Sequence, residues 1–114
     1  MKKVLIVEDI PEHAFLIQHT LVNMAFLTVA CHNVFRALDM IRLGEFDLVI
    51  TDLKMPDMWG VDFIKYIRKF DTSIPIVVVT ASADTETKSD ALQAGANYFI
   101  TKPFRKIDFD NVFH

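Results

Sequence analysis

The sequence is poor in the residues that cross-link or interrupt a chain. Its only cysteine, Cys31, has no partner for an intramolecular disulfide, so the fold has to depend on a packed core, and a reducing cytoplasm is the expected location. Three glycines and four prolines in 114 residues leave no linker or low-complexity stretch. We therefore predict one domain over residues 1–114.

Long apolar runs and an excess of one charge are also absent. The stretch KKVLIVEDI after Met1 is too short for a signal sequence or a membrane span, which predicts a protein without membrane contact. The net charge is −3, and the twelve lysines and arginines are scattered along the chain. This pattern argues against direct nucleic-acid binding, because such proteins gather their basic residues on one face.

What the sequence does contain is a regular alternation of short apolar runs and longer amphipathic stretches. The amphipathic stretches have helical spacing, as at Ala14, Ile17 and Leu21. The apolar runs lack polar alternation, which is typical of strands buried on both faces. These runs cover residues 4–7, 27–30, 48–50, 76–79 and 98–100. The alternation predicts an α/β fold, with right-handed crossover helices on both faces of a parallel sheet.

Polar side chains follow four of these five runs. Glu8 and Asp9 come after the first, Asp52 after the third, Thr80 after the fourth and Lys102 after the fifth. Ligands of parallel α/β sheets bind at the carboxyl ends of the strands, and these ends share one edge. We therefore expect the five side chains to line one crevice.

Charge dictates what such a crevice requires. Two carboxylates about 5 Å apart repel each other by roughly 3 kcal/mol at an effective dielectric constant near 20. Lys102 neutralises one charge, and a divalent cation would offset the rest. Oxygen ligands favour Mg²⁺ over zinc, and the four histidines show no metal-ligand spacing.

A carboxylate beside a cation and a lysine is equipped to attack phosphorus and to form an acyl phosphate. Asp52 is the candidate nucleophile, because the loop after it, which contains Pro56 and Gly60, would expose its carboxylate at the strand end. Thr80 could donate a hydrogen bond to a phosphoryl oxygen. That bond would form only after phosphorylation, so it could act as a switch.

Four motifs together resemble the receiver domain of bacterial response regulators, of the chemotaxis type, over almost the whole chain. They are VLIVEDI, DLKMPDMWG, VVVTAS and YFITKPF. The resemblance implies a flavodoxin-like three-layer sandwich with a five-stranded parallel sheet in the order 2-1-3-4-5. The last helix is expected to be short, or the chain to be cut from a longer protein, because only RKIDFDNVFH follows Phe104.

The resemblance also assigns the phosphoryl chemistry. It implies that Asp52 accepts a phosphoryl group from a histidine kinase or a phosphotransfer domain in a two-component phosphorelay. Mg²⁺ would be held by Glu8, Asp9, Asp52 and the main-chain carbonyl of Lys54. Thr80 and Lys102 would both engage the acyl phosphate.

Three further residues are implied to modulate the switch. Phe99 occupies the aromatic switch position, whose burial accompanies phosphorylation in this family. Lys54 and Ser82 stand two residues beyond Asp52 and Thr80, where side chains influence the access of the hydrolytic water. The expected outcome is a signalling switch that phosphorylates itself from a donor and slowly hydrolyses the product, without metabolic enzyme activity.

The surplus of apolar residues predicts partner surfaces. Phe15 and Phe26 near the first helix are candidates for kinase docking, and Phe104 and Phe109 for an output domain or a homodimer through the last helix and strand. Core packing is the alternative for each. Trp59 in the loop before the third helix is predicted either to contact a partner or to cover the neighbouring helix.

Other interpretations remain open at this point. An aspartate-nucleophile phosphohydrolase would need a second aspartate at position 54, where this chain has lysine. A non-phosphorylated interaction module on the same fold would keep the acids as surface, with Asp9 serving as a helix cap. A flavin or dinucleotide carrier is disfavoured, because no glycine-rich loop follows the first strand.

Overall fold

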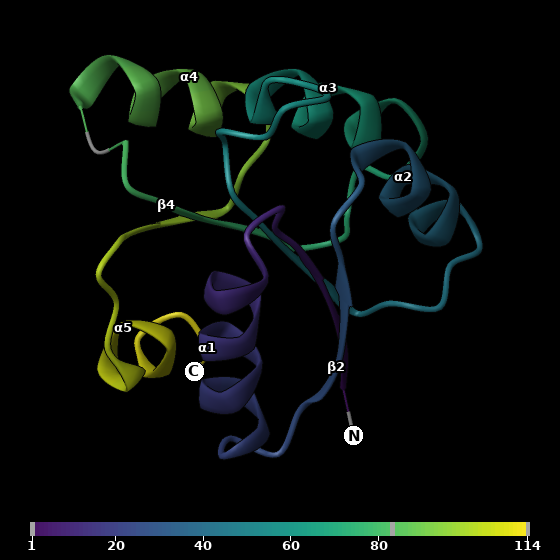
Figure 1. Cartoon of the computed structure of the whole chain (residues 1–114). Helices are drawn as coiled ribbons and strands as arrows, with labels where there is room; N and C mark the ends of the chain where they lie inside the picture. Colours follow the sequence, from purple (N-terminus) through teal and green to yellow (C-terminus); the bar gives the residue numbers. More distant parts are fainter. Residues whose placement is uncertain (1, 83, 114) are drawn as a thin grey trace.

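Five strands form one parallel sheet in the order β2-β1-β3-β4-β5, as predicted (Figure 1). The structure is a computed structural model that describes residues 2–82 and 84–113. Strands and helices alternate along the whole chain. Their bounds are β1 (Lys3–Val7), α1 (Pro11–Val22), β2 (Leu27–Cys31), α2 (Val34–Arg42), β3 (Leu48–Thr51), α3 (Gly60–Phe70), β4 (Ile76–Thr80), α4 (Thr85–Ala94), β5 (Tyr98–Thr101) and α5 (Lys106–Asp110).

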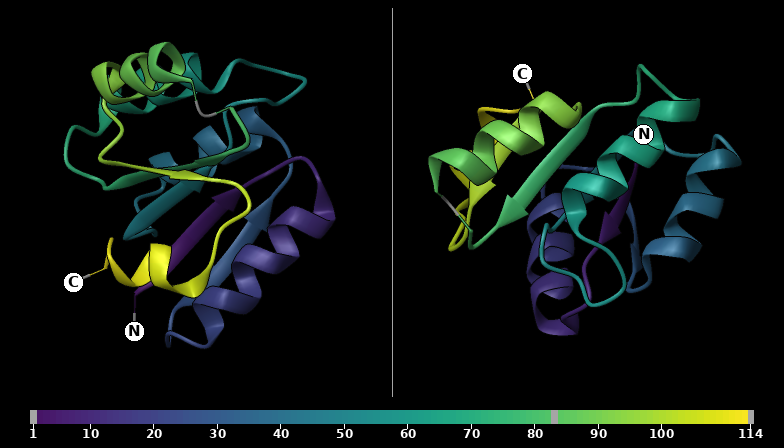
Figure 2. Two further views of the ribbon diagram at one scale, coloured as in Figure 1. Left: turned by 90° about the vertical axis from the view of Figure 1, so that its left-hand side faces the viewer. Right: turned by 90° about the horizontal axis from the view of Figure 1, so that it is seen from above.

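The helices cover both faces of the sheet and give three layers. Helices α1 and α5 lie on one face, and α2, α3 and α4 lie side by side on the other (Figures 1 and 2). Each face has its own apolar core: Leu5, Val49 and Val78 point to the side of α2–α4, while Ile6, Ile50 and Val77 point to the side of α1 and α5. This alternation is the period of two that a strand imposes on its side chains.

The prediction that all five strands are buried on both faces is correct for β1, β3 and β4 and wrong for the other two. Strands β2 and β5 are the edges of the sheet, and Leu27 and Tyr98 at their starts are 54% and 44% exposed. A neighbour on one side alone cannot cover an edge strand completely, and the apolar composition of the two runs does not reveal this position.

The helix ends follow the sequence signals. The Asp84 side chain caps α4 by accepting a hydrogen bond from the Thr87 amide at 2.7 Å. Gly95 ends the same helix with a positive φ of 125°, and Gly44 follows α2 with a φ of 73°, which glycine adopts without steric cost.

The last helix is short, with five residues, as expected. Phe109 is completely buried and its ring stands edge-on to Phe104, while Phe26 packs on Phe113 with ring centroids 4.9 Å apart. Of the two roles weighed for these residues, the structure therefore favours core packing for both: Phe109 belongs to the core on the α1 and α5 side, and the half-buried Phe26 packs against that core. Phe15, in contrast, is 65% exposed.

Among the residues that the structure describes, no helix combines the length and the apolar character needed to span a membrane.

Candidate functional site

The strand register brings the predicted polar residues to one edge of the sheet. Val7 pairs with Thr51, and Thr51 pairs with Val78, so the residues that follow these strands are neighbours. On the far side, Thr80 pairs with Thr101 of β5. The main-chain N–H of Lys102 then donates to the Thr80 carbonyl at 2.8 Å, so Lys102 begins its loop beside the end of β4. The Lys102–Pro103 peptide bond is cis.

The ammonium group of Lys102 lies between two buried carboxylates. Its Nζ donates to Glu8 Oε1 at 2.5 Å and to Asp52 Oδ2 at 2.8 Å. Glu8 is 1% exposed and Asp52 8%, so these charges interact away from bulk water. The imidazole Nδ1 of His13 lies 2.7 Å from the same Nζ. We call this arrangement around Asp52 Oδ2 the lysine side of the site, made by Glu8, His13 and Lys102.

The pKa directions follow from this geometry. Burial raises the pKa of Glu8, and its hydrogen bond from Lys102 does not fully compensate. Burial also acts to raise the pKa of Asp52, but hydrogen bonds from Lys102 and Thr80 outweigh it, so the net direction is downward. For Lys102, the hydrogen bonds to Asp52 and Glu8 outweigh burial and raise the pKa above 10.5. Asp52 is therefore held as a carboxylate, the form that a nucleophile requires.

A shallow hollow lies next to the loop that follows Asp52. Asp9, Lys54, Met55, Pro56 and Trp59 line it. We call it the open side. The Oδ1 atom of Asp9 is buried, and within residues 2–82 and 84–113 it has no hydrogen-bond partner. Asp9 does not cap α1, because Ile10 is the N-cap and makes no side-chain cap bond. A buried carboxylate oxygen without a partner is costly and requires an explanation.

The loop after β3 shapes the open side. The Lys54 and Leu53 amides donate to Asp52 Oδ1 at 3.3 and 2.6 Å, and Lys54 forms a bridge with Trp59 across the loop. Gly60 allows this close return: a Cβ there would lie 2.4 Å from Leu53 Cα and 2.7 Å from the Asp52 carbonyl oxygen. The side chain of Lys54 is exposed, and Trp59 is 39% exposed.

The residues present fit a hard divalent cation on the open side. Asp9 supplies an oxygen that has no other partner among the described residues, and carboxylate and carbonyl oxygens are the ligands that Mg²⁺ prefers. The lysine side is different. There the ligand atoms of Glu8, His13 and Asp52 lie within 4.8 Å of one another, but the Lys102 ammonium bonds to Glu8 and Asp52 and lies against His13.

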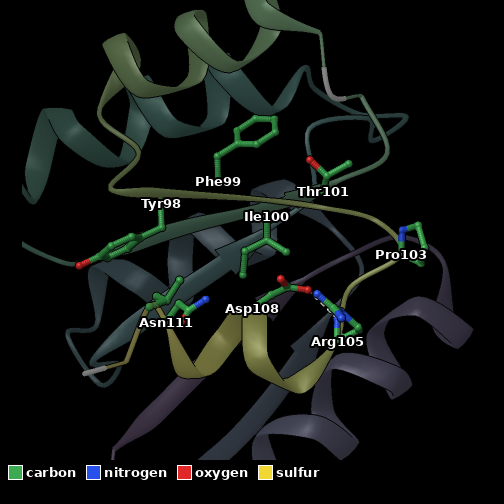
Figure 3. Close-up of a pocket in the computed structure, with 9 residues that line it drawn as sticks. Tyr98, Phe99, Ile100, Thr101, Pro103, Arg105, Asp108 and Asn111 are labelled. Atoms are coloured by element: carbon green, nitrogen blue, oxygen red, sulfur yellow. Dashed lines mark hydrogen bonds between the residues drawn. The ribbon is translucent and has the colours of Figure 1, made fainter.

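The modulating residues lie around this site. Thr80 is buried at the end of β4, and its Oγ1 accepts from the Ser82 amide at 3.3 Å. The Ser82 hydroxyl oxygen is buried and has no partner within the described part of the chain. Phe99 is half-buried and points to the core under α3 and α4, whereas Ile100 points to the opposite side of β5 (Figure 3).

A pocket between β5 and α5 lies beside these two residues. Tyr98, Ile100, Arg105, Asp108 and Asn111 are among the residues that line it (Figure 3). The main-chain N–H of Arg105 donates to Asp108 Oδ2 at 2.7 Å, which closes the first turn of α5. Glu8, Asp52 and Lys102 are not among the residues that line it.

His13 is the site residue that sequence reasoning missed. At the sequence level we consider the histidines only as metal ligands, and spacing between metal ligands does not reveal a histidine that contacts a lysine. A usable signal existed: His13 is the polar residue next to Ala14, which begins the buried stripe of the helix that follows Glu8 and Asp9. A polar side chain at that edge of the first turn faces the strand ends.

Comparisons with known proteins agree with this geometry. A family model described as the response regulator receiver domain matches residues 4–113. Chemotaxis protein CheY-3 of Vibrio cholerae is 37% identical over 105 residues, which cover 90% of this chain and 81% of that protein. Transcriptional regulatory protein ZraR of Klebsiella oxytoca is 33% identical over 109 residues, which cover 96% of this chain. The chain spans only 24% of the length of ZraR.

The solved structures include the receiver domain of sensor histidine kinase PA1611 from Pseudomonas aeruginosa. It superposes with a TM-score of 0.88, covering 97% of this chain and 93% of that one at 24% identity. At this identity the likeness concerns the fold alone. That protein was solved with a magnesium ion coordinated in its active-site cleft.

Proposed function

The chain belongs to the family of response regulator receiver domains, the phosphoacceptor switches of two-component signalling, and on that premise we propose that Asp52 accepts the phosphoryl group. The observation that carries this proposal is the asymmetry around Asp52. A lysine ammonium binds one Asp52 oxygen at 2.8 Å, and Asp9, which has an unpartnered buried oxygen among the described residues, lines the hollow beside the loop after Asp52. We propose that residues 1–114 act as one receiver unit.

The transfer follows from these contacts. An Asp52 carboxylate oxygen attacks the phosphorus of a phosphohistidine, the P–N bond breaks, and the imidazole leaves with its electron pair. Lys102 then donates to a phosphoryl oxygen while it stays bound to Glu8, and Thr80 donates a further hydrogen bond. Water later attacks the acyl phosphate and releases inorganic phosphate, which restores the Asp52 carboxylate. This chemistry makes the chain a signalling switch with no separate metabolic substrate.

The Mg²⁺ ion belongs on the open side. Asp9, Asp52 and the main-chain carbonyl of Lys54 would hold it, with Glu8 acting through the shared charge cluster, because the Glu8 Oε1 atom already pairs with Lys102. When bound, Mg²⁺ supplies positive charge that offsets the oxygens of the transferring phosphoryl group. Asp9 lines the hollow, so the ion would approach its carboxylate from there.

The switch itself involves Thr80 and Phe99. A phosphoryl group adds up to about two negative charges beside Thr80 and draws its hydroxyl inward. The space that Thr80 vacates allows the half-buried Phe99 ring to sink further into the core under α3 and α4. The face near α4 and β5 repacks as a result, and an output domain or a second copy of the chain would read this change.

The phosphodonor docks beside the lysine side. A largely apolar groove runs from α1 to the loop after β5, and it includes Leu16, Lys102, Pro103 and Phe104. The exposed Phe15 extends this surface along α1. A histidine kinase or phosphotransfer domain bound here would present its phosphohistidine next to Asp52. We propose that the chain meets these partners in the cytoplasm, without contact to a membrane or to nucleic acid.

Lys54 and Ser82 set the lifetime of the phosphoryl group in this proposal. The exposed Lys54 lines the open side, where its ammonium can pair with phosphoryl oxygens and hinder in-line attack by water. Ser82 offers a hydroxyl beside Thr80. The two side chains thus flank the path of the hydrolytic water.

Acetyl phosphate tests the proposal without a partner protein. Incubation with Mg²⁺ should add the mass of one phosphoryl group to the wild type, as measured by intact mass spectrometry. The Asp52→Asn variant should gain none, and Asp57→Asn, which changes an exposed aspartate in the same loop, should behave as wild type. Phosphate gain by Asp52→Asn at the wild-type rate would refute the assignment.

A further inference from the structure

His13 contacts the one lysine that the phosphoacceptor chemistry requires. It lies in the first turn of α1, where its main-chain N–H donates to the Ile10 carbonyl at 3.1 Å. From there its imidazole Nδ1 lies 2.7 Å from Lys102 Nζ and 3.5 Å from Glu8 Oε1. No step of the proposed transfer uses this histidine.

The hydrogen-bond inventory of an ammonium group defines what the contact means. Lys102 has three N–H donors and no acceptor, so each close partner must accept. Three acceptors surround Nζ: Glu8 Oε1, Asp52 Oδ2 and His13 Nδ1. An imidazole nitrogen that accepts from this ammonium carries no proton itself, so the contact requires the tautomer of His13 with the proton on Nε2.

We infer that His13 is a positioning residue of the phosphoacceptor site that acts through Lys102. Glu8 and His13 hold two of the three ammonium hydrogens, and the tetrahedral geometry then directs the third at Asp52. The side chain of Lys102 is 12% exposed and that of His13 is 40% exposed, so the imidazole is the more solvent-accessible of the two partners. This inference rests on the proposed function.

A pair of substitutions separates positioning from mere packing. In His13→Asn, the amide Oδ1 can take the place of Nδ1 as acceptor, whereas His13→Leu fills similar space without any acceptor. We expect His13→Leu to gain phosphate from acetyl phosphate roughly tenfold more slowly than wild type, the lower end of what loss of an orienting partner costs. His13→Asn should recover most of the rate.

Gln18 provides the matched control. It lies on the same helix, but its side chain donates to Thr28 Oγ1 of β2 at 3.3 Å and does not line the groove that His13 and Lys102 share. Gln18→Leu should therefore phosphorylate at the wild-type rate. A wild-type rate in His13→Leu, or an equally slow rate in His13→Asn, would overturn the inference.

A second measurement does not depend on phosphorylation. The ¹⁵N chemical shifts of the His13 ring, recorded at about pH 8 where an ordinary histidine is neutral, should report the tautomer with the proton on Nε2. A proton on Nδ1 would overturn the inference, because Nδ1 could then not accept from Lys102. If the wild type gained no phosphate, the proposed function would fail, and the tautomer would still decide whether His13 orients Lys102.

Discussion

The two sides of Asp52 differ in how completely their charges are matched. On the lysine side, the ammonium of Lys102 already bonds to Glu8 and Asp52 at 2.5 and 2.8 Å. On the open side, Asp9 has a buried oxygen with no partner in the described part of the chain. The lysine side is thus preformed, while the open side leaves one carboxylate oxygen without a partner, which supports the Mg²⁺ site that we propose there. In this proposal Asp52 serves two cations at once: Lys102 through Oδ2, and Mg²⁺ from the open side.

Removal of Lys102 should have the largest effect, because it leaves Glu8 and Asp52 buried without a cation. Lys102→Met is expected to lower the free energy of unfolding by about 3 kcal/mol, measured by urea denaturation. It should slow phosphate gain by roughly 100-fold. Lys106→Met is the control, since its ammonium pairs with Asp110 at 3.2 Å on an exposed helix and should cost less than about 1 kcal/mol. An equal decrease in the free energy of unfolding in both variants would contradict a preformed lysine side.

Removal of the Asp9 charge should affect the open side alone. Asp9→Asn is expected to weaken Mg²⁺ binding by roughly 10- to 100-fold. It should not destabilise the metal-free protein, because removal of the Asp9 charge reduces the repulsion among the acids of the site. Trp59, the only tryptophan, lines the same hollow, so its fluorescence can follow the titration. Asp57→Asn should bind Mg²⁺ as wild type, and similar weakening in the two variants would argue against a specific role for Asp9.

The pH dependence of stability measures how far the hydrogen bond from Lys102 offsets the burial of the Glu8 carboxylate. The pKa of Glu8 is raised above 4.5, so the folded state holds its proton more tightly than the unfolded state. The resulting stability is present below pH 4.5 and is lost as the pH rises through the higher folded pKa. Glu8→Gln has no such loss. Its free energy of unfolding relative to wild type should therefore increase between about pH 4.5 and neutrality, and a constant difference would mean that Lys102 fully offsets Glu8.

The smallest effect is expected at Lys54. Lys54→Asn should shorten the lifetime of the phosphorylated protein by about two- to fivefold, which corresponds to an exposed ion pair of up to about 1 kcal/mol. Loss of phosphate can be followed by intact mass after removal of the donor. Lys65→Asn, which changes an exposed lysine of α3, should leave the lifetime unaltered. Identical lifetimes in the Lys54 variant and wild type would remove Lys54 from the lifetime proposal.

The sequence predicted the sheet and its polar edge because both depend on local patterns. Apolar runs located the five strands to within one residue, and the residues after them met because parallel strands end on one side. The ends of α4 at Asp84 and Gly95 are local in the same sense, since they depend on neighbouring backbone atoms.

What the sequence did not predict depends on neighbours that are distant in the chain. The exposure of Leu27 and Tyr98 follows from the order of the strands, not from their composition. The burial of Phe109 follows from how a short α5 settles on the sheet. The contact of His13 with Lys102 spans 89 positions in the chain, and no spacing rule encodes it.

Locating a bound cation tests the two-sided account most directly. A crystal structure of the protein with Mn²⁺ in place of Mg²⁺ would locate the ion by its anomalous scattering. The account predicts one peak on the open side, beside Asp9 and Asp52, with Lys102 still bonded to Glu8. A peak among Glu8, His13 and Asp52, with the Lys102 side chain expelled, would contradict it.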